Sequence, residues 1–327
     1  MIFMKKILTV LLIAIIATGG LSACGNDVSD AHVSSTSEIY IPVIALGYSS
    51  QFWQAVKQGC EEAASDYGVK ITFEGPVDET MVDKQVDILK TSLQNNPEAI
   101  CMAAIDLESV RQILEEQKAK GIPIVAFDAG LGEDIPDVTC SVDNTAAGAM
   151  AAEHAAEAIG NKGKIGIIGH SETVPDAVAR VQGFADKIAK DYPDIEIVDI
   201  QYADGDHLKS AEAVKGMLAA DSEIQLVYTT NEGATVGTYN GIKELGKIGQ
   251  VQIIGFDSSA ALKAAVRNGD IIGAITQDPV TEGYKTVETA VKLLKGDDLG
   301  TTFIDCGFYW YNKDNMDSSE IAPCLYD

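Results

Sequence analysis

Histidine is scarce in this sequence, and the motifs on which most enzymes depend are missing. The 327 residues include four histidines, which lie in unrelated sequence contexts. No Gly-x-Ser-x-Gly elbow occurs, and the glycines of 163–169 are spaced three apart, which fits neither a dinucleotide fingerprint nor a phosphate loop. We therefore expect a protein that is not an enzyme, with no catalytic residue, no metal site and no cofactor.

Basic residues are also few. Lysine and arginine number 24 against 49 aspartates and glutamates, which gives a formal net charge of −25. Residues 1–23 carry two lysines and no acid, so their removal moves the net charge from −25 to −27. Nucleic acids would repel so acidic a chain, and we expect no nucleic-acid partner.

The six cysteines are too irregularly spaced for a disulfide framework. No Cys-x-x-Cys pair occurs, and an odd number of cysteines, five, follows Cys24. The same spacing argues against a zinc site. Cys101 and Cys140 lie in strand-like runs and are expected to be small buried hydrophobic residues. The sequence leaves open whether a single disulfide joins Cys306 to Cys324.

Long apolar runs are absent except near the N-terminus. Lys5 and Lys6 precede an apolar run, 7–17, that is broken only by a threonine and is too short to span a bilayer comfortably. Small residues follow it and complete the three-part pattern of a secretory signal peptide. We therefore predict a signal peptide over residues 1–23.

The predicted cleavage point resembles a bacterial lipobox. Leu-Ser-Ala precedes Cys24, whose thiol would receive a diacylglycerol, with palmitate as an expected fatty acid. The alternative is an ordinary signal peptide with a chance cysteine nearby. Residues 24–38 are polar and indicate a flexible tether. We expect a lipoprotein anchored on the extracytoplasmic face of the cell membrane, periplasmic or at the cell surface.

From residue 39 on, short apolar runs alternate with amphipathic segments of helical period. This alternation predicts an α/β fold of parallel sheets wrapped by helices, and its restart after Asp143 predicts two doubly wound lobes. The predicted strands lie at 41–46, 69–73, 99–103, 122–127, 138–142, 164–168, 195–202, 226–229, 251–256, 271–276 and 302–308. The predicted helices lie at 52–67, 79–95, 107–120, 145–159, 177–191, 208–219, 234–245, 260–268 and 280–295.

The two halves share a strand that runs into Phe-Asp and a small residue. Asp128 follows the apolar run 124–127, and Asp257 follows the run 253–256. Ligands of open α/β sheets bind just beyond the carboxyl ends of the strands, so each half offers a carboxylate there. The alternative is that both aspartates cap the turn or helix that follows. Position and duplication favour ligand contact.

Several motifs in a fixed order resemble one family. They lie at 45–53, 121–128, 143–144, 180–184, 230–232, 255–257 and 275–277. On these motifs the chain, from 41 to 305, resembles the ribose-binding (type 1) periplasmic binding proteins, the sugar-binding components of bacterial ABC importers. The resemblance implies two lobes joined by a three-strand hinge that crosses near 142–143, 277–278 and 304–305. Lobe 1 would then comprise 39–142 plus 278–304, and lobe 2 would comprise 143–277 plus 305–327.

The resemblance also implies a sugar site. In that family an aromatic pair after the first strand stacks on the sugar ring, and Phe52 and Trp53 stand there, with Ser50 as a polar contact from the preceding turn. A flat aromatic face suits the apolar C–H face of a sugar. The alternative is that both aromatics, or Phe52 alone, belong to the core.

Five polar residues match the family's remaining ligand contacts. Asp128 and Asp257 match carboxylates that accept hydrogen bonds from hydroxyls, and Arg180 matches a forked donor of the second lobe. Asn231 and Gln277 match amides that both donate and accept. Without the resemblance, Arg180 would be interpreted as a solvated helix residue and Asn231 as a helix N-cap.

The pattern departs from that of ribose binders at three positions. Ala104 replaces an asparagine, Ala129 followed by Gly130 replaces an arginine, and Gly205 replaces an aromatic residue. These changes predict a roomier pocket with two carboxylates against one guanidinium. A larger or differently hydroxylated sugar, a polyol or an amine-bearing ligand fits this residue set better than ribose.

The implied function is capture of a sugar or sugar-like ligand by a monomer for delivery to an ABC permease and its ATPase. A sensor that presents the ligand to a membrane histidine kinase or a chemotaxis receptor would have the same pocket and is the alternative. The segment after Asp305 extends past the family's usual end, and no role is assigned to it.

Overall fold

The computed structural model describes residues 38–326. The predicted signal peptide, the acceptor Cys24 and all but the last residue of the predicted tether lie outside this range. Within it, no helix is both long enough and apolar enough to cross a membrane.

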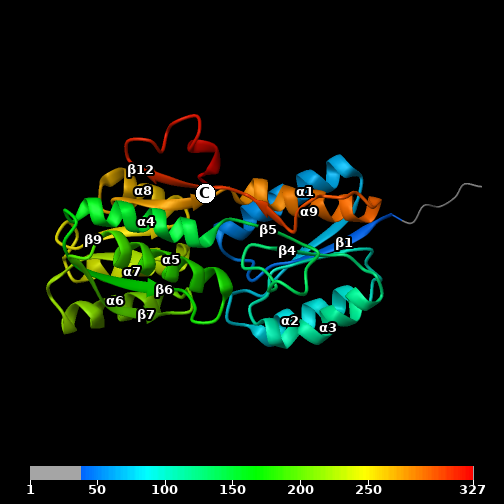
Figure 1. Cartoon of the computed structure of the whole chain (residues 1–327), viewed down its shortest axis with the longest axis horizontal. Coiled ribbons are helices and arrows are strands. Elements are labelled where there is room, and N and C mark those ends of the chain that lie inside the picture. The colour runs from blue at the N-terminus through cyan, green and yellow to red at the C-terminus, as the bar shows by residue number, and fades with distance from the viewer. Residues whose placement is uncertain (1–37, 327) are drawn as a thin grey trace, which may run out of the picture. The chain divides into compact units, whose positions relative to one another are not determined.

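The first sheet has six strands, all parallel. In spatial order they are β2 (Lys70–Glu74), β1 (Tyr40–Ile44), β3 (Ile100–Met102), β4 (Ile124–Phe127), β5 (Val138–Ser141) and β11 (Phe303–Asp305). Helices pack on both faces (Figure 1): α1 (Gln51–Tyr67) with α9 (Pro279–Lys295), and α2 (Val82–Leu93) with α3 (Leu107–Ala119). A separate apolar core lies on each face.

The second sheet repeats this arrangement. Its strands are β7 (Ile195–Tyr202), β6 (Gly163–Gly169), β8 (Ile224–Thr229), β9 (Gln252–Phe256), β10 (Gly273–Gln277) and β12 (Phe308–Asn312). One core lies under α4 (Asn144–Ala158) and α5 (Pro175–Asp191). The other lies under α6 (His207–Ala220), α7 (Glu232–Glu244) and α8 (Ala260–Asn268).

The predicted fold class is confirmed. In each sheet the order in which successive strands are added turns back at the first strand, β1 or β6, as it does in doubly wound sheets. One edge strand, β12, was not predicted. β12 runs antiparallel to β10, with Gln277 opposite Phe308. The sequence does not reveal this strand's direction, because its pairing partner is set by the tertiary fold. Gly307, at φ +82°, supplies the left-handed residue between β11 and β12.

The chain passes between the two sheets three times: from β5 to α4, from β10 to α9, and from β11 to β12. These passages are the places where the resemblance puts the hinge. The lobe boundaries drawn from the sequence stay a prediction.

Glycines allow two pairs of helices to cross closely. A Cβ atom at Gly59 of α1 or at Gly283 of α9 would overlap a backbone carbonyl of the facing helix. The same holds for Gly148 of α4 and Gly183 of α5. Any larger residue would therefore push the two helices apart. The α4–α5 crossing fixes the position of the residues that α5 carries toward the strand ends.

The chain after β12 ends against elements of both lobes. The N–H of Ser258 donates to the hydroxyl of Tyr326 over 3.1 Å, and the N–H of Tyr326 donates to Ser258 Oγ over 3.0 Å. The ring of Tyr326 packs edge-on against Phe52 of α1, with centroids 5.9 Å apart. The C-terminal segment therefore connects the second sheet to the first lobe.

All five cysteines in the described range are buried free thiols. The bridge between Cys306 and Cys324, left open on sequence grounds, is not formed. Cys101 and Cys140 are fully buried, as predicted.

Candidate functional site

A cavity of about 490 Å³ lies at the carboxyl ends of strands from both sheets. Each of the eight predicted ligand residues lines it: Ser50, Phe52, Trp53, Asp128, Arg180, Asn231, Asp257 and Gln277. They come from six separate stretches of the chain, which the fold brings together. Their role in ligand contact stays a prediction.

Asp128 and Asp257 occupy equivalent positions with the same backbone conformation. Both adopt left-handed φ angles, +49° and +69°, which aspartate tolerates better than most residues. Their backbone N–H groups donate to the next strand, and their carbonyls accept from Ser141 Oγ over 2.6 Å and from the Tyr311 hydroxyl over 2.9 Å. These contacts hold an unfavourable backbone conformation at both strand ends, a pattern associated with functional sites.

The two carboxylates differ in their partners. Asp257 accepts from Gln277 Nε2 over 2.8 Å and from the N–H of Glu232 over 3.0 Å. It does not cap the helix that follows, because Ser259 caps α8. Among the described residues, the carboxylate of Asp128 has no hydrogen bond and no ion pair. Burial raises the pKa of both carboxyls.

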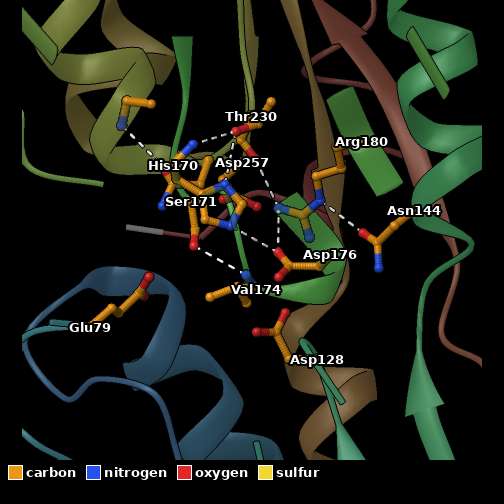
Figure 2. Close-up of polar contacts among 12 residues, drawn as sticks. Glu79, Asp128, Asn144, His170, Ser171, Val174, Asp176, Arg180, Thr230 and Asp257 are labelled. Atoms are coloured by element: carbon orange, nitrogen blue, oxygen red, sulfur yellow. Dashed lines mark hydrogen bonds and ion pairs between the residues drawn. The ribbon is translucent and has the colours of Figure 1, made fainter. Parts of the chain in front are cut away.

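Arg180 is 2 % exposed, so its interpretation as a solvated helix residue is wrong. Its guanidinium donates to Asn144 Oδ1 over 2.8 Å and to the carbonyl of Thr230 over 2.9 Å (Figure 2). It also stacks on the ring of Phe256, 3.9 Å from the centroid. One nitrogen, Nη2, is buried without a hydrogen-bond partner in the described part of the chain. The fork is therefore held rigidly, with one donor left for a ligand.

Asp176 and His170 complete a network around Arg180 that the sequence analysis missed. Asp176 Oδ2 lies 3.4 Å from Arg180 Nη1 and 3.1 Å from His170 Nε2, and His170 Nδ1 lies 2.8 Å from Thr230 Oγ1. Burial alone would raise the pKa of Asp176, but His170 and Arg180 lower it below its ordinary value. His170 follows β6 directly, so the strand-end rule applied to the aspartates would also have identified it.

The predicted aromatic pair is largely buried. Trp53 is 2 % exposed, donates from Nε1 to Glu79 Oε1 over 2.9 Å and meets Phe127 edge-on. Phe52 lies against Trp53 and Tyr326. Both rings line the cavity and also belong to the core of the first lobe. Phe52 and Trp53 are therefore core residues, and both also stand where the predicted stacking on a ligand would take place.

Two predicted polar contacts also act as helix caps. Ser50 Oγ accepts from the N–H of Trp53 over 3.4 Å, and Asn231 Oδ1 accepts from the N–H of Ala234 over 2.8 Å. The N-cap interpretation of Asn231 is therefore correct for its oxygen. Oε1 of Gln277 is buried and has no hydrogen-bond partner among the residues that the structure describes. Together with Arg180 Nη2, the site therefore offers a ligand both a hydrogen-bond donor and an acceptor.

Further carboxylates around the cavity were not predicted. They are Asp78, Glu79, Asp204, Asp206 and Glu232, all on loops or first helical turns. Burial raises the pKa of Glu232 to about 7 and also raises that of Glu79. Only Glu232 lies in one of the motifs noted in the sequence, 230–232, and no local pattern distinguishes the other four among the 49 acidic residues.

Comparison with known proteins places this geometry in a family. Residues 41–298 match the periplasmic binding protein domain. A xylitol-binding protein of Mycolicibacterium smegmatis is 28% identical over 285 residues, which cover 86% of this chain and 79% of that protein. The ribose import binding protein of Bacillus subtilis is 24% identical over 298 residues, 90% of this chain and 94% of that protein.

A solved structure shows the same fold. It is an ABC transporter solute-binding protein from Agrobacterium vitis bound with α-D-tagatopyranose. It superposes with a TM-score of 0.84 at 29% identity and covers 89% of this chain and 100% of that chain. The resemblance seen in the sequence is confirmed. This chain belongs to the periplasmic binding proteins, extracytoplasmic proteins that bind solutes rather than transform them.

Proposed function

We propose that this chain captures a sugar or sugar-like ligand between its two lobes and delivers it to an ABC permease and its ATPase. The observation that carries the proposal is the convergence of eight predicted residues on one cavity. That cavity combines aromatic rings with a rigid guanidinium, two carboxylates and two amides, which suits a hydroxylated ligand. The relatives named for xylitol, ribose and tagatopyranose support the same ligand class.

A thermal-shift screen of the purified protein against pentoses, hexoses, polyols, amino sugars and nucleosides tests this proposal. A tight ligand stabilises the folded state by mass action, by about 2.7 kcal/mol at one hundred times its Kd. We expect Asp257→Ala and Arg180→Ala to abolish the shift caused by the best compound. Unchanged affinity in both variants would show that the ligand binds elsewhere.

The proposal includes a lipid anchor at Cys24, on the extracytoplasmic face of the cell membrane. The signal-peptide pattern of residues 1–23 and the lipobox-like residues before Cys24 support it. The protein is expected to act as a monomer. Metabolic labelling with palmitate should mark the natural chain but not a Cys24→Ala variant, which should appear in the soluble fraction. Equal membrane retention of both chains would refute the anchor.

A further inference from the structure

More carboxyl groups than basic side chains line the cavity. Eight carboxylates and two fully basic side chains line it. Both cations are engaged, because Arg180 lies 3.4 Å from Asp176 and Lys209 lies 2.7 Å from Asp204. The other six carboxylates have no ion-pair partner among the described residues. A positively charged ligand would favour the charged forms of the buried Asp128 and Asp257, whose pKa values burial raises.

Asp128 is the most informative of these six carboxylates. It is 7 % exposed, and its side chain makes no hydrogen bond or ion pair within residues 38–326. Ala129 and Gly130 follow it, so its own loop supplies no cation. Figure 2 shows its carboxylate turned toward Asp176 and Arg180 without a contact to either. An isolated buried carboxylate is costly unless a counter-ion or several donors reach it.

Two buried polar atoms that line the cavity lack hydrogen-bond partners, which a hydroxylated ligand could supply. Within residues 38–326, Arg180 Nη2 is a donor without an acceptor and Gln277 Oε1 an acceptor without a donor. Both side chains are 2 % exposed and line the cavity. Hydroxyl groups both accept and donate, so they satisfy both atoms. The unmatched groups therefore call for a ligand that has hydroxyls and a positive charge.

We infer that the ligand is a polyhydroxylated amine, with its protonated nitrogen at Asp128 and its hydroxyls at Arg180, Gln277 and Asp257. This inference rests on the proposed function and narrows its ligand class. The ammonium group would convert a costly buried carboxylate into a charge-assisted hydrogen bond, which is roughly twice as strong as a neutral one.

Matched compounds test the inference by isothermal titration calorimetry at pH 7. The probes are D-glucosamine, D-galactosamine and 1-amino-1-deoxysorbitol, each compared with its hydroxyl and N-acetyl counterparts. N-acetylation keeps the nitrogen but removes its charge. We expect at least one amine to bind about tenfold more tightly, or better, than both of its neutral counterparts.

Asp128→Asn should remove that margin without disturbing the fold. Asparagine has the same shape and tolerates a left-handed backbone, and the hydrogen bonds of residue 128 to Cys140 and Ser141 use backbone atoms. The control is Asp186→Asn, which makes the same charge change on the exposed side of α5, away from the cavity. It should leave all affinities unchanged.

The outcomes separate the inference from the proposed function. If neutral compounds bind and no amine exceeds its counterparts tenfold, the amine inference is overturned while sugar capture stands. Equal weakening of amine and neutral ligands by Asp128→Asn would overturn the assignment of the ammonium to Asp128. If no compound of either series binds, and the wider sugar and polyol screen is also silent, both fall.

Discussion

Arg180 shows how one side chain can serve the fold and the site together. Its guanidinium bridges α4, through Asn144, and the end of β8, through the carbonyl of Thr230, while its face covers Phe256. A planar group with five donors can do this, whereas the single ammonium of lysine cannot.

Arg180→Lys should therefore weaken ligand binding at least tenfold and lower the free energy of unfolding by roughly 1–3 kcal/mol, because buried partners lose their donors. Calorimetry and urea denaturation measure the two effects. Arg267→Lys is the control, because Arg267 pairs with Asp317 at the exposed surface and should change neither quantity. A fully active, fully stable Arg180→Lys protein would contradict this account.

Glu282 is a buried carboxyl that makes the stability of the protein depend on pH. It is fully buried in the first turn of α9, and neither of its oxygens has a hydrogen-bond partner within residues 38–326. Burial raises its pKa to about 8. A raised pKa means that the folded state binds the proton more tightly than the unfolded state. The resulting stability is complete below the unfolded pKa and is lost as pH rises through 8.

Glu282→Gln should remove this dependence. We expect unfolding free energies close to those of the natural protein at pH 5, and higher by on the order of 3 kcal/mol at pH 9. Denaturation curves at pH 5, 7 and 9 measure the difference. Glu115→Gln, at an exposed position on α3, should reproduce the natural profile. Parallel profiles of the Glu282→Gln and natural proteins would rule out a titrating Glu282.

Sequence reasoning reached those site residues that follow a recognisable local rule. Asp128 and Asp257 could be predicted because each comes directly after a buried strand. Asp176 could not, because it belongs to the site only through its approach to His170 and Arg180. Such approaches depend on how a helix lies against a neighbouring strand end, which local pattern does not specify.

At the scale of elements, the reciprocal glycines of α4 and α5 set how deeply α5 lies against its neighbour. Gly183 faces a backbone carbonyl of α4, and Arg180 stands one turn before it on the same helix. Separation of the helices would therefore also move the guanidinium away from Asn144.

Gly183→Ala should lower the free energy of unfolding by roughly 1–3 kcal/mol, as overpacking does, and should weaken ligand binding in parallel. Gly216→Ala provides the matched control. Gly216 lies inside α6, and a Cβ atom there would meet open space. That variant should gain up to about 1 kcal/mol from helix propensity. A neutral Gly183→Ala would show that the crossing is not close-packed in solution.

The elements themselves were predictable because strand and helix periods are local properties. Every predicted strand and helix has a counterpart in the structure, with ends that shift by a few residues. β12 was not predicted as a strand, because Phe308–Asn312 is an aromatic run without clear alternation. Only the free edge of β10 determines how this segment pairs.

At the scale of the whole molecule, the predicted ligand contacts come from residues that follow strands of both sheets. A ligand held by Asp128 on one side and by Arg180 and Asp257 on the other stabilises the arrangement in which all three reach it. Binding should therefore favour a more closed arrangement of the lobes.

Small-angle X-ray scattering should show a smaller radius of gyration at saturating ligand than in its absence. The Arg180→Ala variant should show no change at the same ligand concentration, since it would not bind. An unchanged radius in the natural protein, at a concentration where calorimetry shows full occupancy, would exclude closure as the consequence of binding.

The segment after β12, up to Tyr326, is a poor place to attach a tag or a reporter group. Tyr326 is hydrogen-bonded to Ser258, the neighbour of Asp257. It also packs on Phe52, which lines the cavity. A bulky group introduced next to Tyr326 would strain its contacts to Ser258 and Phe52, which adjoin the cavity from the two lobes. A reporter for a sensor built from this protein therefore belongs in a distant surface loop.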